Sequence, residues 1–345
     1  MSDLAFLEVD MLQTKILESL SGMVQEASSL NDPTKNAEER LAHYNKSYLQ
    51  FIQSGMVPTL KKIFQLNGGS PAILQYAACL LRNIVQFEEG QTACVLESLH
   101  FDLIGAIKDH CHNSSLTFEL VMCLRGCMRS SVINDCVKAV PLLMNLLRVH
   151  STVPSLVGAT VGTLFHFAKF GRLTEEMPLF FELLKQYSAN LVVLKELLDL
   201  FEYLSCLDLG KVQCLVMGLY VYLEELLERH LACPSVCATI LAVVRNGSCN
   251  FEAGKQVLVK RTKLRHLIIK CLKVHCTQEQ MCLHAMAALN TLTFNRPEVQ
   301  EHLIHSGIVP ILVRVFLLHP KCSFLKLHTV TLLNKLGYGW DGTKK

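Results

Sequence analysis

The sequence predicts an all-α fold, a right-handed α-solenoid of about seven three-helix repeats, and three observations predict it. Apolar residues recur at the i, i+3, i+4 and i+7 spacing of amphipathic helices, whereas strict alternation over five or more residues is rare. The phrase FIQSGMVPTLKKIF at 51–64 returns almost unchanged as LIHSGIVPILVRVF at 303–316. Its glycines, Gly55 and Gly307, are 252 positions apart, which is six times 42.

A long apolar helix is a second landmark and gives the same period. It first occurs as PAILQYAACLLRNIV at 71–85, where Ile73, Tyr76, Leu80 and Ile84 fall on one helical stripe. Aligning seven such segments gives steps of 43, 40, 36, 44, 45 and 44, with a mean of 42. The aligned register positions are Asn83, Gly126, His166, Glu202, Asn246, Thr291 and Lys335.

The repeated phrase predicts a sharp corner between two helices. Gly55 and Gly307 suit the position after a helix C-terminus, where a left-handed backbone is easiest for glycine. Pro58 and Pro310 suit the first turn of the next helix, where a missing N–H costs little. Two other repeats have a proline at the corresponding place without the glycine, namely Pro141 and Pro178.

This organisation resembles the armadillo repeat family, or its relative HEAT, whose repeats span about 40 to 47 residues. The resemblance covers roughly 42–339 and is closest in the first repeat, YLQFIQSGMVPTLKKIF, and the last, VQEHLIHSGIVPILVRVF. The repeats between 131 and 208 are degenerate, and a HEAT-like or irregular helix pair is an equal alternative near 171–208. The resemblance implies stacked repeats that form a superhelix with a concave face.

The segments flanking the array have simpler patterns. Residues 1–25 predict a helix with a broad apolar side, which either caps the first repeat or docks a partner. Residues 26–41 are polar, contain Asp-Pro and predict a linker. Residues 340–345 predict a C-terminal tail.

Composition limits the class of protein. Half of the residues are apolar and 18% are charged, which predicts a folded chain, and a net charge of +3 predicts no strong overall attraction to nucleic acid. Fifteen cysteines and the acidic start MSDLAFLEVD, which lacks secretory-leader features, predict a cytoplasmic or nuclear location. The uncharged stretch 149–168 is rich in Ser, Thr and His, so we expect a buried helix and no membrane insertion.

Motifs for catalysis, cofactors and metals are missing from the sequence. It has no Walker-type phosphate loop, dinucleotide glycine fingerprint, nucleophile elbow or zincin helix, so we expect no enzyme and no cofactor. Cys123/Cys127 and Cys233/Cys237 have a zinc-like gap, but both pairs fall within predicted helices more than one hundred residues apart. We expect free thiols that pack as small hydrophobes, and no metal.

The resemblance implies that the third helices line a groove, where an asparagine late in the helix binds the main chain of an extended peptide. Asn83 and Asn246 match that asparagine, and the other five register positions do not. The tryptophan found one turn earlier in importin-alpha-like receptors is replaced by Cys79, Met122 and Ala242. A classical receptor for nuclear localisation signals is therefore not expected.

Basic residues partly replace the asparagines. Arg82, Arg125 and Arg245 each precede a register position, and His166 and Lys335 occupy one. Arginines at equivalent places suit an acidic peptide, as in the groove of beta-catenin-like proteins, because they bind carboxylates through charge-assisted hydrogen bonds. The alternative is that each arginine covers the exposed edge of its helix.

A second basic feature is the segment 255–273. Nucleic acid, an anionic lipid or an acidic protein are candidate ligands, but it has no aromatic residues for base stacking, and a solvated helix face is the simpler alternative. Its charges are Lys255, Lys260, Arg261, Lys263, Arg265, Lys270 and Lys273.

The sequence therefore predicts a non-catalytic protein-binding scaffold or adaptor. The expected ligand is an extended or helical segment of a partner protein, with acidic character, held in the concave groove. One alternative is a scaffold that associates with nucleic acid through 255–273, and another is an enzyme with an unrecognised site. The sequence leaves the partner's identity and the oligomeric state open.

Overall fold

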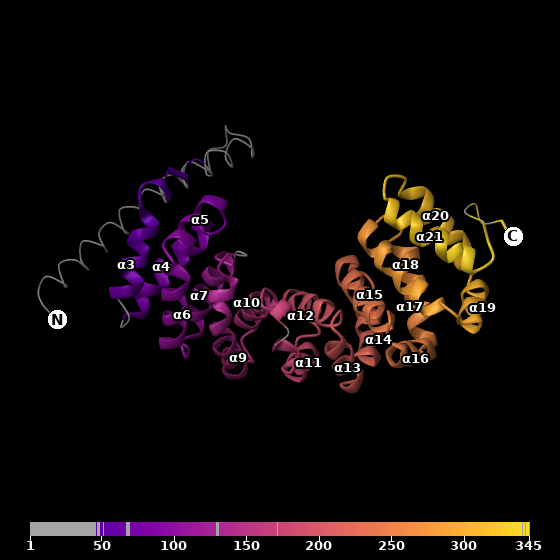
Figure 1. Cartoon of the computed structure of the whole chain (residues 1–345), viewed down its shortest axis with the longest axis horizontal. Helices are drawn as coiled ribbons and strands as arrows, with labels where there is room; N and C mark the ends of the chain where they lie inside the picture. The colour runs from indigo at the N-terminus through magenta and orange to yellow at the C-terminus, as the bar shows by residue number, and fades with distance from the viewer. Residues whose placement is uncertain are drawn as a thin grey trace, which may run out of the picture. The chain divides into compact units, whose positions relative to one another are not determined.

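The computed structural model describes residues 46, 49–50, 52–66, 70–128, 131–170, 172–339, 341 and 343–344. The chain divides into two compact units, Met1–Phe167 (unit 1) and Ala168–Lys345 (unit 2). Helices fill the described parts of both units, and the only β-pairing there is an isolated bridge between Tyr338 and Lys344 (Figure 1). The helix predicted over 1–25 and the linker over 26–41 lie outside the described residues.

Unit 1 contains three successive repeats. The second has three full helices, whereas the third begins with one α-helical turn and a 3₁₀ segment, in keeping with its degenerate sequence. The elements are α3 (Met56–Leu66), α4 (Pro71–Ile84), α5 (Glu88–Leu96), α6 (Leu99–Asp109), α7 (Ser114–Gly126), α8 (Ile133–Cys136), η1 (Val137–Ala139), α9 (Val140–Val149) and α10 (Pro154–Phe165).

Unit 2 contains four successive repeats. Two 3₁₀ segments replace the first helix of its first repeat, and the other three repeats are complete. The elements are η2 (Ala168–Phe170), η3 (Arg172–Thr174), α11 (Met177–Gln186), α12 (Leu191–Leu204), α13 (Asp208–Val216), α14 (Leu219–Arg229), α15 (Pro234–Ser248), α16 (Glu252–Lys260), α17 (Thr262–Val274), α18 (Glu279–Thr293), α19 (Pro297–His305), α20 (Ile308–Leu318) and α21 (Ser323–Lys335).

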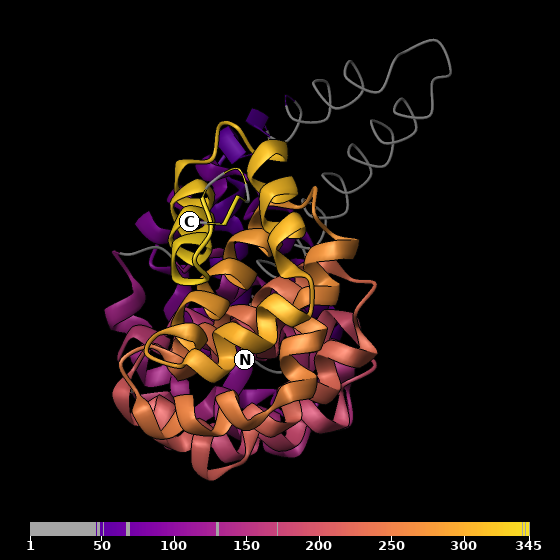
Figure 2. The same cartoon turned by 90° about the vertical axis from the view of Figure 1, so that its right-hand side faces the viewer.

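The third helices of successive repeats pack side by side and form the spine of each unit. In unit 1 α7 contacts both α4 and α10, and in unit 2 α12, α15, α18 and α21 pack in that order. Leu241 of α15 and Leu289 of α18 are fully buried on this spine. Both views show the yellow C-terminal helices lying along the orange helices of the preceding repeat (Figure 1, Figure 2). The predicted all-α solenoid of about seven three-helix repeats is confirmed.

The repeat register is correct in six repeats and one residue off in the fourth. Each register position lies twelve residues after the first residue of its helix, as Asn246 does in α15, except that Glu202 lies eleven residues after Leu191. The helix start in the fourth repeat makes Tyr203 the equivalent residue. The apolar pattern of that repeat is too continuous to distinguish the two alignments.

The corners have the predicted geometry. Gly55 and Gly307 adopt φ values of +83° and +70°, and Pro58 and Pro310 lie in the first turn of α3 and α20. The structure adds two further corners with a left-handed residue, Gly218 and Ser98, at φ values of +75° and +55°. They were missed because neither is followed by the Val-Pro pair.

The uncharged stretch 149–168 contains α10, a helix of 12 residues that is buried over most of its length. No single described helix has the length and composition of a membrane span. The helices α19 and α20 reach that length and composition only together, and they are bent by 82° at their junction.

Histidines that follow the second helices connect neighbouring repeats. His230 Nε2 lies 2.6 Å from Ser188 O, and His275 Nε2 lies 2.6 Å from Leu231 O, so each imidazole N–H donates to a backbone carbonyl just beyond the preceding second helix. His150 and His319 make the same contact, to Cys111 O and Cys276 O. This hydrogen bond satisfies carbonyls that the helix ends leave unpaired.

Replacing one of these histidines is expected to destabilise unit 2. His275→Ala leaves the Leu231 carbonyl with only the long contact from Cys237 Sγ at 3.8 Å, so the free energy of unfolding should fall by about 1–3 kcal/mol. The exposed His112 is the matched control, and His112→Ala should change the free energy of unfolding by less than about 0.5 kcal/mol. Urea denaturation followed by circular dichroism measures both, and equal stability of the two variants would contradict a role for the histidine contact.

Candidate partner-binding groove

A groove of about 800 Å³ lies over the third helices of the last three repeats of unit 2. The helices α15, α18 and α21 supply most of its lining, and the start of α16 with its preceding loop supplies the rest. We refer to it as the α15–α21 groove. Its charged, amide and aromatic lining includes Arg245, Lys255, Asn290, Phe294, His328 and Lys335.

Arg245 is held in a fixed position by its neighbours. Its Nε and Nη2 donate to Asn246 Oδ1 at 3.0 and 2.9 Å, and its Nη1 lies 3.3 Å from His284 Nδ1 on α18. Burial raises the pKa of Glu202 on α12, and the charge of Arg245 acts against that rise. The hydrogen bonds that orient the guanidinium go to the neutral side chains of Asn246 and His284, so they leave its charge available to a ligand.

Asn246 lies beneath the groove and does not line it. Its side-chain nitrogen donates to Glu202 O at 2.9 Å and to Ser205 Oγ at 3.1 Å, and the residue is only 6% exposed. Its side-chain oxygen accepts from Arg245. The direct contact with a peptide main chain that the resemblance implied for Asn246 does not fit this geometry, because its donors and acceptor are already used.

Two lysines flank an exposed aromatic ring in the groove. Lys255 donates to Phe294 O at 2.6 Å, and its Nζ lies 5.2 Å from the centre of the Phe294 ring. Lys335 donates to Asn290 O at 2.8 Å, and its Nζ lies 5.5 Å from the same ring. The Phe294 residue is 56% exposed. The ring faces of aromatic side chains attract cations, so Phe294 helps to hold both ammonium groups at the groove.

The groove has an excess of positive charge. Burial, and after it the charge of Lys255, lower the pKa of Lys335. Glu252 is the one carboxylate among the described residues that line the groove, and it forms an ion pair with Arg296. The lining therefore favours an anionic ligand.

Two histidines share this positive environment. Burial and then Arg245 lower the pKa of His284 to about 4. Burial, followed by Arg245 and Lys335, lowers the pKa of His328. Both imidazoles are therefore neutral at neutral pH, and the cations of the groove are Arg245, Lys255 and Lys335.

The predicted site residues of unit 1 have other environments. Arg82 forms an ion pair with Glu119 of α7 at 3.0 Å, so its charge is neutralised within the unit. Asn83 and Arg125 are half-buried, and His166 packs edge-on against Phe165 at 6.2 Å between ring centres. The predicted set thus divides, with Arg245, Asn246 and Lys335 together in unit 2 and the remainder in unit 1.

The contrast between Arg82 and Arg245 comes from one position in the next repeat. Glu119 is the sixth residue of α7, and His284 is the sixth residue of α18. Arg82 faces the glutamate and Arg245 faces the histidine, so the same arginine position is paired in one repeat and retains its charge in the other.

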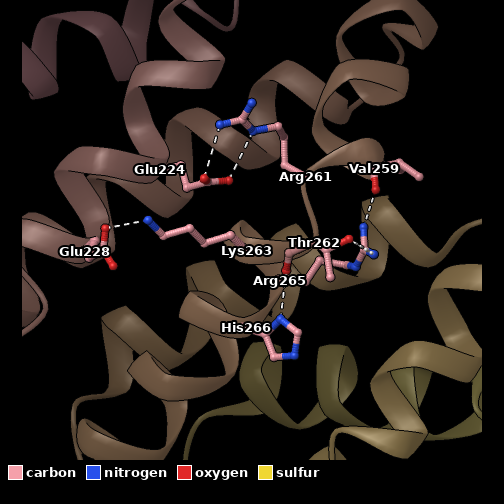
Figure 3. A network of polar contacts seen from close by, with 8 residues as sticks. All are labelled: Glu224, Glu228, Val259, Arg261, Thr262, Lys263, Arg265 and His266. Carbon is pink, nitrogen blue, oxygen red and sulfur yellow. Dashed lines mark hydrogen bonds and ion pairs between the residues drawn. The ribbon is translucent and has the colours of Figure 1, made fainter.

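Three basic side chains in the middle of the segment 255–273 form ion pairs or hydrogen bonds within unit 2. Arg261 donates from Nε and Nη2 to the two oxygens of Glu224, at 3.1 Å each, and Lys263 forms an ion pair with Glu228 at 2.6 Å (Figure 3). Arg265 is 7% exposed and donates to Val259 O and to Thr262 Oγ1 (Figure 3).

The segment therefore does not form one continuous basic surface, which corrects the prediction of a single patch. Lys255 is buried and belongs to the α15–α21 groove. Lys260, Lys270 and Lys273 are exposed, and only the last two line a common pocket. The sequence pattern shows the run of charges, but the partners in neighbouring repeats decide which of them are paired.

Sequence reasoning missed Phe294, His284 and the position of Lys255 in the groove. The signal for Lys255 is the dipeptide Gly-Lys, which occurs at 210–211 and again at 254–255. Lys211 donates to Cys249 O at 3.1 Å, as Lys255 does to Phe294 O, so each lysine binds the C-terminal end of the third helix of its own repeat. Phe294 is turned outward where the chain leaves α18 through Asn295, whose φ is +55°.

The cysteines are free thiols, and many are buried. Burial raises the pKa of Cys282 to about 12 and that of Cys136 to about 11. In the part of the chain that the structure describes, no group of three or more His, Cys, Asp or Glu side chains is placed to hold a metal ion.

The comparisons with known proteins show the fold. No family model matches the sequence, and no curated protein is significantly similar to it. The structure is similar to one solved in work on a phosphorylation switch that controls the interaction between cadherin and beta-catenin, with a TM-score of 0.60 and 16% identity. The match covers 89% of this chain and 60% of the other, so this chain spans less than two thirds of that protein.

A second solved structure, an engineered protein from a structural genomics consortium, matches 83% of this chain and 98% of its own at 14% identity. Its TM-score is 0.39. The cadherin and beta-catenin structure is an armadillo-repeat fold, and the chain has an armadillo-like helical-repeat fold.

The electrostatic environment of His284 gives a direct test of the groove. We expect His284 to titrate near 4, and Arg245→Gln to raise its pKa toward the ordinary 6.5 without reaching it, because burial remains. An unfolded histidine binds its proton near 6.5, so this residue's contribution to folding stability is lost as the pH falls from 6.5 toward 4.

Nuclear magnetic resonance of the histidine rings measures this pKa in both proteins. Arg314→Gln, at an exposed site, is the matched control and should leave the pKa of His284 unchanged. A wild-type pKa near 6.5, or an equal value in the Arg245→Gln variant, would show that Arg245 does not act on His284.

Proposed function

We propose that the chain is a non-catalytic protein-binding scaffold whose α15–α21 groove holds an acidic segment of a partner protein. The observation that carries this proposal is the convergence of Arg245, Lys255 and Lys335 on one groove whose only described lining carboxylate is already paired with Arg296. Like charges held together are costly, and a carboxylate from a partner relieves that cost through charge-assisted hydrogen bonds.

Apolar side chains at the groove indicate that the ligand is more than a simple anion. Phe294 is 56% exposed and Leu327 is 62% exposed, and both line the groove. Burying exposed aromatic and aliphatic groups contributes most of the affinity at protein interfaces, whereas charges contribute mainly to specificity and association rate. A segment that combines acidic and apolar residues, extended or helical, fits this lining.

The structural neighbour supports the same class of function. The work that produced it concerns an interaction between two proteins, cadherin and beta-catenin. Repeat solenoids hold side chains at fixed spacing along an extended surface, which suits binding of a long segment. The basic segment 255–273 was the basis for the nucleic-acid alternative, and its partial use in internal ion pairs favours the protein ligand.

Charge changes within the groove test the proposal. Affinity capture followed by quantitative mass spectrometry should enrich a set of proteins with wild type and lose it with the double variant Arg245→Glu and Lys335→Glu. A partner segment identified this way should bind the double variant at least about tenfold more weakly in fluorescence anisotropy, since two favourable contacts become repulsive. The exposed Lys260 and Lys321 provide the matched double control with the same change of charge.

A second variant uses the contrast between the two units. His284→Glu places a carboxylate beside Arg245, as Glu119 lies beside Arg82 in unit 1. It should weaken binding of the same partners without changing the helix content measured by circular dichroism. Capture that is unchanged in both groove variants would exclude this groove. Retention of nucleic acid in place of proteins, lost only when the exposed Lys260, Lys270 and Lys273 of the segment 255–273 are changed to Glu, would favour the nucleic-acid alternative.

A further inference from the structure

A second polar groove of about 580 Å³ lies elsewhere in unit 2, between α17 and α19. It shares no lining residue with the α15–α21 groove. We refer to it as the α17–α19 groove. Its lining residues are His266, Ile269, Lys270, Lys273, His302, His305 and Ser306.

Helical spacing places these residues on two facing stripes. His266, Lys270 and Lys273 follow one another at i, i+4 and i+7 on α17, so they share one face of that helix. On α19 and its C-terminal end, His302 and His305 are separated by one turn. The rings of His266 and His302 meet across the groove, with their centres 4.8 Å apart and their planes at 81°.

The α17–α19 groove has nitrogen groups and no carboxylate among its lining residues. Two lysines and three histidines line it, and the charge of the buried Arg265 acts on His302. Burial lowers the pKa of His302, and Arg265, His266 and His305 lower it further, which shows a positive environment. Burial lowers the pKa of Arg265, and Glu298 on α19, which does not line the groove, acts against that change.

Two nitrogen atoms near this groove have no hydrogen-bond partner among the described residues. One is His302 Nδ1 and the other is Arg265 Nε, and both are shielded from solvent. Ser306 Oγ donates to His302 O at 2.8 Å, which fixes the serine beside the ring. The groove therefore combines two exposed lysine charges with a pair of histidine rings that contact each other.

We propose that the α17–α19 groove binds a phosphate-type polyanion, either a free polyphosphate or the phosphorylated headgroup of a lipid. A phosphomonoester carries about −1.5 to −2 charges and three strong acceptor oxygens, which matches several converging nitrogen donors better than a carboxylate does. The groove, at about 580 Å³, accommodates a headgroup that carries more than one phosphate.

The apolar content of the lining distinguishes this ligand from a peptide. Ile269 is the only apolar lining residue, and it is 4% exposed. A peptide segment would find no exposed aliphatic or phenyl side chain in this lining, in contrast to the exposed Phe294 and Leu327 of the α15–α21 groove. Recognition by charge and hydrogen bonds alone suits a small, highly charged ligand.

Binding of defined probes to the full chain tests the proposal. Isothermal titration calorimetry with sodium pyrophosphate and with inositol hexakisphosphate covers the free ligands. Sedimentation with phosphatidylcholine vesicles, with and without phosphatidylinositol bisphosphate, covers the lipid headgroup. Binding of the soluble probes alone assigns a free polyphosphate, and binding to the phosphoinositide vesicles alone assigns a lipid headgroup.

Variants connect the binding to this groove. The double variant Lys270→Gln and Lys273→Gln should weaken whichever probe binds by roughly tenfold or more, because two charge-assisted contacts are removed. His302→Gln should weaken it while leaving the net charge at neutral pH unchanged. The double control Lys260→Gln and Lys321→Gln removes the same charge at exposed positions outside the groove and should bind like wild type.

A further control separates the two grooves. Arg245→Gln with Lys335→Gln alters only the α15–α21 groove, so it should retain binding of the phosphate probes. The proposal is overturned if no probe binds, or if the Lys270 and Lys273 variant binds as tightly as its control.

Discussion

Packing of the third helices against one another within each unit is the constraint on which both units depend. The helix α15 shows this best, because its residues from Val236 to Val244 are all buried, on every side of the helix. A helix that is apolar around its whole circumference is stable in water only when other elements cover it on several sides. One repeat cannot provide that cover, so successive repeats must stack.

Polar side chains then fix how one repeat sits on the next. Asn246 binds the end of α12, Arg261 binds Glu224, and His275 binds the chain beyond α14. Each of these contacts satisfies a buried or half-buried polar group that the apolar spine would otherwise leave unpaired. Two separate grooves of unit 2 are lined by cations that no described carboxylate of a neighbouring repeat neutralises, and these cations are the candidates for binding ligands.

The fold could be predicted from the sequence because its signals act within a single repeat. The glycine and proline of the corner and the helical period of the apolar residues need no knowledge of a distant segment. The site was harder to predict, because a residue about forty positions away determines whether a charged side chain is paired. Arg82 and Arg245 occupy equivalent positions, yet Glu119 neutralises the first and His284 leaves the second charged. Asn246 matched a ligand-binding position by sequence, and the preceding repeat uses its amide.

Native-state hydrogen exchange tests the stacking of third helices most directly. The substitution Leu289→Ala removes a fully buried side chain of α18 and should destabilise unit 2 by about 2–5 kcal/mol. If the spine is one cooperative structure, the amides of α15 and α21 lose protection together with those of α18. Loss of protection confined to α18, with α15 and α21 unchanged, would contradict this account.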